Sequence, residues 1–141
     1  IVDIDDFKSI NDNLGHTAGD KVLADLGRLL RDNLGEKDLA GRIGGDEFCV
    51  FLETGSQGAR DGLLEKCDNI RVRVASMYAD EEQTFPLSCS VGAALFPEDA
   101  GTFEELYINA DKALYISKRG GKNSVSFYST GNGSGEENSN G

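Results

Sequence analysis

Two glycines followed at once by two carboxylates, Gly44-Gly45-Asp46-Glu47, are the residues whose types and spacing best suit chemistry. They separate the apolar residue Ile43 from the largely apolar stretch Phe48–Leu52. Apolar residues on either side of a glycine pair predict a β-hairpin whose turn needs positive φ. Because glycine has no Cβ, phosphates can lie close to the backbone there, and the carboxylates can bind a hard cation that accompanies them. We therefore expect this hairpin tip to hold a magnesium nucleotide.

A second pair of carboxylates, Asp3 and Asp5, flanks Ile4 at the start of the sequence. Residues two apart in a strand point to the same face, so these side chains lie together if the strand continues through them. An aspartate at a strand end that faces an aspartate at a hairpin tip can bind Mg²⁺, which takes oxygen ligands at about 2.0–2.1 Å and shares its shell with phosphate and water. Strand-end aspartates are also common as helix caps. The presence of Asp46 in the same chain favours the metal site.

Several polar residues near the first strand are candidates for nucleotide contacts. Lys8 lies one turn into the helix expected there, and with the free N–H groups around Asp6 and Phe7 it could receive a triphosphate. The alternative is a solvated surface lysine. Asn11 and Asp20 offer the donors and acceptors that suit the amide edge of guanine. Helix caps and turns explain these two residues equally well.

Two lysines, Lys118 and Lys122, flank a glycine pair at the end of the last predicted helix. Cations at a helix C-terminus interact favourably with the helix dipole, which explains them without a ligand and is the default interpretation here. The glycines form no Walker or dinucleotide loop, because the sequence has neither GxxxxGK followed by Ser or Thr nor GxGxxG before a helix.

The hydrophobic pattern predicts the elements that must position these residues. The first half is expected to contain a strand over 1–4, a helical turn over 5–11 with Asp5 as N-cap, a break over 15–19, a helix over 20–34 stopped by Gly35, and a hairpin over 38–51. The second half is expected to contain a helix over 59–77 and a strand over 87–96. A helix then runs from a Thr102/Glu105 capping box to the glycines at 120–121, and a strand follows over 124–128. This order favours one sheet that includes the hairpin and is covered by helices.

The charge balance excludes some classes of function. The 141 residues carry 14 basic and 25 acidic side chains, a formal charge of −11, which argues against nucleic acid as a partner and against a general membrane-surface role. The length fits one domain over 1–129. Residues 131–141 include no apolar side chain, so we expect 130–141 to be a flexible polar tail.

Cysteine usage indicates the compartment. Cys49, Cys67 and Cys89 are odd in number and lack metal-type spacing. We expect them to be buried reduced thiols of a cytoplasmic domain.

Taken together, the motifs resemble those of the GGDEF family, the diguanylate cyclases, from the first residue to about Tyr128. The matching stretches are Asp3-Ile4-Asp5-x-Phe7-Lys8-x-Ile10-Asn11-Asp12, Gly15-His16, Gly19-Asp20, Arg42-x-Gly44-Gly45-Asp46-Glu47-Phe48, Ser90-Val91-Gly92, Ala110-Asp111-x-Ala113-Leu114-Tyr115 and Lys118 to Asn123. The resemblance implies an α+β fold with a central mixed sheet surrounded by helices, similar to nucleotide cyclases and polymerase palm domains, with the GGDEF motif on a β-hairpin.

The resemblance also implies an activity, the condensation of two GTP molecules into cyclic di-GMP with release of two pyrophosphates. Two domains of a homodimer would face each other, and each 3′-hydroxyl would attack the α-phosphate of the other GTP. The implied cofactor is Mg²⁺ or Mn²⁺. The implied site residues are Asp3, the carbonyl of Ile4 and Asp46 as metal ligands, Asp6, Phe7, Lys8, Lys118 and Lys122 at the phosphates, Gly44 and Gly45 beside the substrate, Asn11 and Asp20 at guanine, and Asp46 and Glu47 in catalysis.

Two departures from the family pattern bear on regulation and turnover. Many members bind product at an inhibitory Arg-x-x-Asp site; here Asp38 is retained but Gly35 replaces the arginine. Without the bidentate guanidinium, we predict weak or absent feedback inhibition. The family's N-terminal helix and a sensory domain are missing, so we expect a longer parent protein, membrane-attached or not. The alternative function is a GGDEF module that senses GTP or cyclic di-GMP without turnover; the retained signature acids favour the enzyme.

Overall fold

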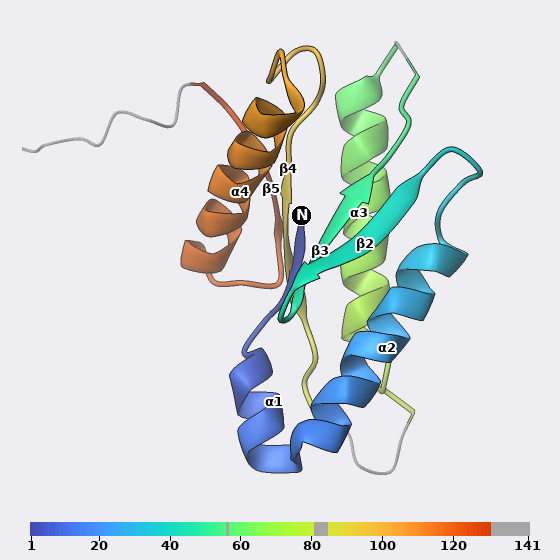
Figure 1. Cartoon of the computed structure of the whole chain (residues 1–141), viewed down its shortest axis with the longest axis vertical. Coiled ribbons are helices and arrows are strands. Elements are labelled where there is room, and N and C mark those ends of the chain that lie inside the picture. The colour runs from blue at the N-terminus through green and yellow to red at the C-terminus, as the bar shows by residue number, and fades with distance from the viewer. Residues whose placement is uncertain (56, 81–84, 131–141) are drawn as a thin grey trace, which may run out of the picture.

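The computed structural model describes residues 1–55, 57–80 and 85–130. Of the tail predicted over 130–141, only residue 130 is therefore among the described residues. The elements are β1 (Val2–Ile4), α1 (Phe7–Leu14), α2 (His16–Asp32), β2 (Leu39–Gly44), β3 (Glu47–Phe51), α3 (Ala59–Ala75), β4 (Cys89–Ala93), α4 (Phe103–Arg119) and β5 (Val125–Phe127) (Figure 1). They follow the predicted order, and the α+β architecture with a mixed central sheet is confirmed.

The first strand of the chain lies in the middle of the sheet, whose order is β2-β3-β1-β4-β5. β1 pairs antiparallel with β3 and β4, β2 pairs antiparallel with β3, and β4 pairs parallel with β5. In this register Asp3 lies opposite Glu47 of β3 and opposite Ser90 of β4. The central strand therefore carries Asp3 between the hairpin and β4.

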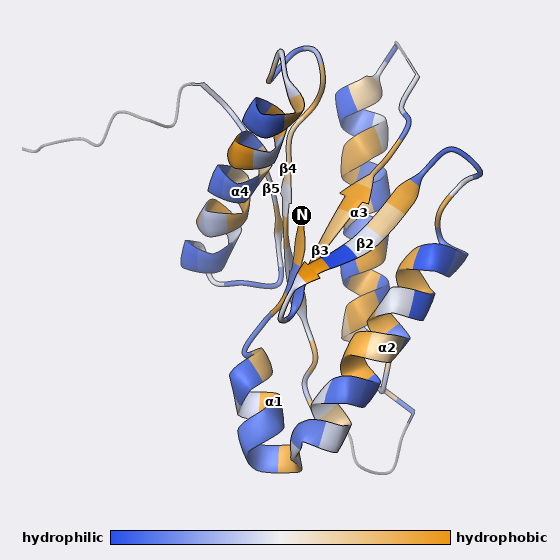
Figure 2. Ribbon diagram, in the orientation of Figure 1, coloured by the Kyte–Doolittle hydropathy of each residue, from blue (hydrophilic) through white to orange (hydrophobic). Residues whose placement is uncertain are grey.

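The two faces of the sheet are covered differently. α2 and α3 lie on one side and α4 on the other (Figure 1). The main core joins Val2, Ile4 and Phe48 of the sheet to apolar residues of α2 and α3, such as Leu26 and Val74, and the hydrophobic colouring of these segments follows it (Figure 2). A smaller cluster beneath α4 contains Ile1, Ala110 and Leu114.

Gly92 of β4 allows α4 to lie against the sheet. A Cβ at this position would overlap the carbonyl oxygen of Ala110 and the backbone of Leu114. On the same helix, Ser117 Oγ donates a hydrogen bond to the Val91 carbonyl at 3.0 Å. The last turn of α4 is therefore held in a fixed position over β4, which matters for the lysine that follows Ser117.

The break predicted over 15–19 is smaller in the structure. Gly15, at φ +84°, separates α1 from α2, but α2 already begins at His16 rather than at 20. Gly19 lies inside α2, buried where the helix meets α1, and a Cβ there would overlap the Asn11 side chain. The prediction treated this glycine as a helix breaker, whereas the structure uses it for close helix packing.

Two helix-end predictions are wrong. Asp5 is not the N-cap of α1: Asp6 occupies that position at φ 53° without a side-chain cap, because Asp5 turns inward to buried partners. Gly35 does not stop α2, which ends at Asp32 with Asn33 as its C-cap. The Asn33 amide donates to the Leu29 carbonyl at 2.6 Å and closes the helix before the glycine is reached.

The remaining elements agree with the prediction apart from their ends. Gly45 has φ +41° in the hairpin turn, as the glycine pair predicted, and α3 begins at Ala59. β4 is shorter than the predicted strand over 87–96. At α4, Thr102 Oγ1 accepts from the Glu105 N–H at 3.2 Å, while the Glu105 carboxylate accepts from the Gly101 N–H at 2.8 Å rather than from Thr102. The capping box is thus confirmed in one of its two bonds.

The cysteines are free thiols. Cys67 and Cys89 are buried and Cys49 is partly buried. Within the described ranges, no helix is both long enough and apolar enough to cross a membrane.

Candidate active site

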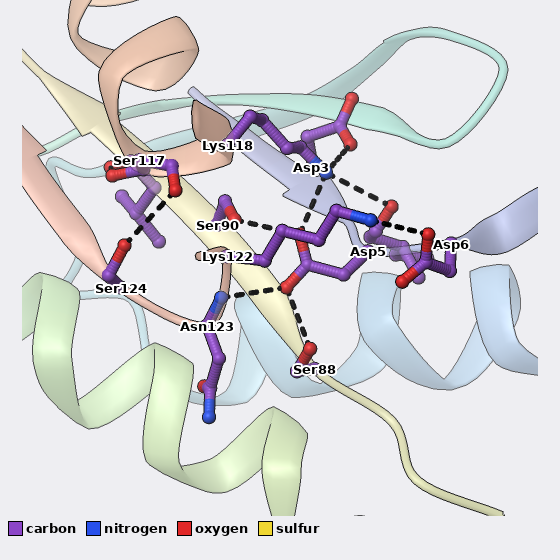
Figure 3. Close-up of polar contacts among 12 residues, drawn as sticks. Asp3, Asp5, Asp6, Ser88, Ser90, Ser117, Lys118, Lys122, Asn123 and Ser124 are labelled. Carbon is purple, nitrogen blue, oxygen red and sulfur yellow. Dashed lines mark hydrogen bonds and ion pairs between the residues drawn. The ribbon is translucent and has the colours of Figure 1, made fainter. Parts of the chain in front are cut away.

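One end of the sheet gathers residues from β1, the hairpin, α1 and the end of α4. Figure 3 shows Asp3, Asp5 and Asp6 facing Lys118 and Lys122, which come from more than 100 residues later in the chain. The hairpin reaches the same end, because the Ile4 N–H donates to the Asp46 carbonyl at 3.2 Å. Five residues predicted from separate motifs, Asp3, Asp6, Asp46, Lys118 and Lys122, are therefore brought together.

Asp5 is the centre of this cluster; the sequence analysis paired it with Asp3 and expected it to cap the first helix, but the site residues implied by the family did not include it. Its carboxylate accepts hydrogen bonds from Ser88 Oγ and Ser90 Oγ, both at 2.7 Å, from the Asn123 N–H at 3.0 Å and from Lys118 Nζ at 2.8 Å. Burial by itself would raise its pKa, but these bonds outweigh burial and hold the pKa below the usual value. Asp5 therefore ties β4, the turn after α4 and Lys118 to the end of β1.

Lys118 bridges the two carboxylates of the Asp-Ile-Asp segment. Its ammonium group pairs with Asp3 and with Asp5, and it lies 3.4 Å from the Ile4 carbonyl oxygen. Burial would lower its pKa, but the two carboxylates outweigh burial and raise it, so Lys118 is charged at neutral pH. The shared lysine brings Asp3 and Asp5 together, although β1 ends at Ile4 and does not continue through Asp5 as the prediction required.

The chain's own residues fit a hard divalent ion at this point. The predicted ligands, Asp3, the Ile4 carbonyl and Asp46, offer only oxygen, the donor that Mg²⁺ and Mn²⁺ prefer. An ammonium already lies against the first two, so this position attracts a cation. Burial raises the pKa of Asp3; the Lys118 ammonium opposes this effect, and the charges of Asp46 and Asp5 add to it.

The predicted metal site is not built from side chains alone. Among the described residues no three His, Cys, Asp or Glu side chains converge as metal ligands. The predicted set relies instead on two carboxylates and a backbone carbonyl. Mg²⁺ is commonly bound by one or two carboxylates together with substrate phosphate and water.

Glu47 is placed differently from the other acids. Its Oε1 atom is buried without a hydrogen-bond partner in the described part of the chain. Burial raises the pKa of Glu47, and the carboxylates of Asp3, Asp111 and Asp46 raise it further. A carboxylate in such surroundings gains from taking up a proton or from contact with a cation.

The N-terminus of α1 forms the neighbouring edge of the cluster. The first N–H groups of a helix have no intrahelical partners, and no side chain caps α1. Lys122 Nζ approaches Asp6 Oδ1 to 2.5 Å beside this terminus. The combination of free N–H groups and a lysine suits an anionic group.

Backbone strain is concentrated here as well. In the part of the chain that the structure describes, the non-glycine residues with positive φ are Asp6, Lys122 and Asn123, at 53°, 65° and 43°. All of them border the cluster around Asp5. Such conformations persist where surrounding contacts enforce them, and they are frequent at functional sites.

The structure places the other predicted substrate residues on α1 and α2. Lys8 is exposed and pairs with Asp12 at 2.8 Å, as a solvated surface lysine would. Phe7 begins α1, and Asn11 lies against Gly19 on α2, next to Asp20. The structure thus brings the two predicted guanine contacts to the same helix junction, while Lys8 remains a candidate only through its place on α1.

Asp38 lies at the far end of the hairpin and has a structural role. Its carboxylate accepts from the Glu53 N–H at 2.7 Å and from the Gly35 N–H at 2.9 Å. These contacts join the segment before β2 to the segment after β3. Each carboxylate oxygen accepts one backbone N–H. The prediction that the inhibitory product site is lost stays untested.

The comparisons with known proteins give the family. Residues 1–124 match the family described as diguanylate cyclase, GGDEF domain. The chain is 45% identical over 122 residues to diguanylate cyclase TpbB of Pseudomonas aeruginosa, covering 84% of this chain and 27% of TpbB. The chain therefore spans about a quarter of that relative's length.

Solved structures agree with the match. The GGDEF domain of the same Pseudomonas aeruginosa protein has a TM-score of 0.79 at 42% identity, covering 91% of this chain and 74% of that one. The active GGEEF domain of a Vibrio cholerae diguanylate cyclase has a TM-score of 0.80 at 32% identity, covering 91% and 80%. With these motifs, this sheet and these relatives, the chain belongs to the GGDEF family of diguanylate cyclase domains.

Proposed function

We propose that this chain is the catalytic domain of a diguanylate cyclase, which condenses two GTP molecules into cyclic di-GMP and two pyrophosphates. The observation that carries the proposal is the meeting of Asp3, the Ile4 carbonyl and Asp46 with two lysines and the free N-terminus of α1. Its composition, oxygen ligands beside anion-binding groups, suits a metal-bound triphosphate. The names of the relatives supply the reaction.

Positioning and charge would supply most of the rate, because phosphoryl transfer asks little covalent chemistry of a protein. Asp3, the Ile4 carbonyl and Asp46 would hold Mg²⁺ or Mn²⁺. When bound, that ion would neutralise charge on the phosphates. The N–H groups around Asp6 and Phe7, with Lys8, Lys118 and Lys122, would hold the triphosphate, and Asn11 and Asp20 would read guanine.

Glu47 is the residue we assign to the proton of the 3′-hydroxyl. A general base works best with a pKa near the operating pH, and burial beside Asp3 and Asp111 moves the Glu47 pKa in that direction. Contact with a second metal ion is the alternative role for the same carboxylate, because its buried oxygen has no partner in the described residues.

The reaction needs two bound nucleotides, so we propose that two copies of the domain face each other and that cyclic di-GMP leaves as product. A relative from Caulobacter crescentus, DgcB, has been solved in complex with c-di-GMP at 31% identity and a TM-score of 0.74. A sensory domain elsewhere in the full-length protein would control the encounter, and we place the GGDEF domain itself in the cytoplasm.

The test is product formation from GTP and Mg²⁺, followed by chromatography across a range of protein concentrations, with Asp46→Ala alongside. We expect cyclic di-GMP to rise more steeply than linearly with protein concentration and to vanish in the variant. If this chain and the full-length protein both bind GTP but form no product at any protein concentration, the proposed cyclase activity is contradicted. The alternative, a nucleotide-sensing module, would then hold.

A further inference from the structure

The ammonium group of Lys118 contacts oxygens that the proposed function assigns to a metal ion. It pairs with Asp3 Oδ1 and lies 3.4 Å from the carbonyl oxygen of Ile4. Both atoms belong to the set proposed above for Mg²⁺ or Mn²⁺. The Lys118 ammonium and the proposed metal ion therefore share two oxygen partners.

Lys118 is held in this position by contacts that need no ligand. Asp5 Oδ1 accepts from its Nζ at 2.8 Å, and Asp5 is fixed in turn by Ser88 and Ser90. The neighbouring Ser117 Oγ donates a hydrogen bond to the Val91 carbonyl, which fixes the helix turn that carries Lys118 against β4. The Lys118 side chain is 26% exposed, so it lies at the edge of the cluster and not in the core.

A divalent ion and this ammonium compete for the same oxygens. An ion bound to Asp3 and to the Ile4 carbonyl would lie beside the positive charge of Lys118, and like charges at such a distance repel strongly. Entry of the metal alone therefore requires Lys118 to give up Asp3 without receiving a new partner. A triphosphate changes the balance, because its oxygens are strong charge-assisted acceptors for an ammonium.

We propose that Lys118 is an internal counter-cation that couples metal binding to nucleotide binding. Without nucleotide it holds Asp3 and the Ile4 carbonyl and weakens metal binding; with nucleotide it moves to a phosphate and releases both oxygens. Lys118 is thus a positioning residue in the free protein. The inference rests on the proposed metal site at Asp3 and Ile4, and the experiment separates the two.

The experiment measures Mn²⁺ binding to the nucleotide-free protein by electron paramagnetic resonance in wild type, Lys118→Met and Lys122→Met. Lys122→Met is the matched control, since it removes the same charge from the same cluster but pairs with Asp6 instead of the metal ligands. We expect Lys118→Met to bind Mn²⁺ about tenfold more tightly than wild type, and Lys122→Met to change the affinity less than about twofold. Equal gains in both variants, or no gain in Lys118→Met, would overturn the inference.

Two additions keep the outcome clear. Asp3→Asn in the Lys118→Met background should abolish the gain in Mn²⁺ affinity. If Asp3→Asn leaves Mn²⁺ binding unchanged both with and without nucleotide, the proposed metal site itself is contradicted. If Lys118→Met does not fold, the lysine ammonium signal of wild type is followed by NMR, assigned with Lys118→Arg. Mg²⁺ alone should leave it unchanged while Mg²⁺ with 3′-deoxy-GTP, which cannot be condensed, shifts it. The same shift with Mg²⁺ alone would contradict the proposal.

Discussion

Asp5 directly follows β1, Glu47 begins the neighbouring strand β3, and the two carboxylates lie in opposite surroundings. Asp5 accepts hydrogen bonds from Ser88, Ser90, Lys118 and Asn123, and its pKa is lowered. Glu47 has a buried oxygen with no partner in the described residues, and burial beside other acids raises its pKa. The first carboxylate is fully used in joining elements of the fold, whereas the second remains available to a proton or a cation.

This contrast distinguishes a carboxylate with a structural role from one available for chemistry, which a sequence motif alone cannot do. Asp5 stands in the Asp-Ile-Asp segment and invites assignment as a metal ligand, yet its bonds leave it little capacity for one. Glu47 follows the turn residue Asp46, and its buried Oε1 has no hydrogen-bond partner among the residues that the structure describes. A substitution at Asp5 should therefore act on stability, and a substitution at Glu47 on activity.

The largest expected effect is the loss of activity in Glu47→Gln. If Glu47 accepts the proton of the 3′-hydroxyl, its amide should lower cyclic di-GMP formation by about 10²–10⁴-fold. Stability at pH 7 should stay within about 1 kcal/mol of wild type or rise, because the change removes a charge disfavoured by burial and by Asp3 and Asp111. Turnover assays and denaturant unfolding measure the two quantities.

Glu53→Gln is the matched control for this prediction. Glu53 follows the same strand, but it pairs with Lys37 at the exposed far end of the hairpin. It should leave both activity and stability close to wild type. Activity retained in Glu47→Gln, or a loss of several kcal/mol of stability, would reverse the contrast with Asp5.

The second effect is the loss of stability in Asp5→Asn, expected to be about 3 kcal/mol at pH 7 because Lys118 loses a buried charged partner. The lowered pKa of Asp5 gives the pH dependence. Its contribution is complete above the unfolded pKa of about 3.9 and is lost as the pH falls through the lower folded value. The unfolding free energies of wild type and variant should therefore converge in acid.

Ser88→Ala tests the same cluster with a smaller change. It removes one hydroxyl bond to Asp5 and should cost about 1 kcal/mol. A difference between Asp5→Asn and wild type that stays constant down to pH 2 would show that charge on Asp5 does not stabilise the fold.

The contrast also explains how far the sequence could predict the site. The hairpin with its positive-φ glycine follows from a local pattern, whereas the placement of Asp3 beside the hairpin follows from the resemblance to the family; the structure agrees with both. The role of Asp5 could not be predicted in this way, because Ser88, Ser90 and Asn123 are 83, 85 and 118 residues away. A strand-end aspartate before a helix has the same local pattern whether it caps the helix or turns inward.

Gly19 and Lys118 carry the same lesson. A glycine between two helical stretches predicts a break, but the structure places Gly19 inside α2 against Asn11. A lysine at a helix end predicts an interaction with the dipole, but Lys118 pairs with Asp3 and Asp5 at the end of β1. In both cases the deciding neighbour comes from packing between elements, which periodicity and spacing do not encode.

The smallest expected effect concerns two cysteines, one on each side of the contrast. Cys89 is buried next to Asp5, and burial raises the pKa of its thiol to about 12. Cys49 lies near Glu47, is only partly buried, and has its pKa raised by burial as well. Because the thiolate is the nucleophile, iodoacetamide should alkylate Cys49 first and Cys89 only on unfolding, as peptide mass spectrometry would measure.

The alkylation rate of Cys89 can therefore be used to compare the effects of substitutions at Asp5 and Glu47 on this end of the sheet. Asp5→Asn should speed the alkylation of Cys89, because the cluster that holds β4 against β1 is loosened, while Glu47→Gln should leave Cys89 as slow as in wild type. Labelling in denaturant serves as the control, since all three thiols should then react alike. If Cys89 reacts at the same rate in both folded variants, Asp5 does not hold this end of the sheet together, and its bonds to Ser88 and Ser90 contribute little to keeping β4 closed.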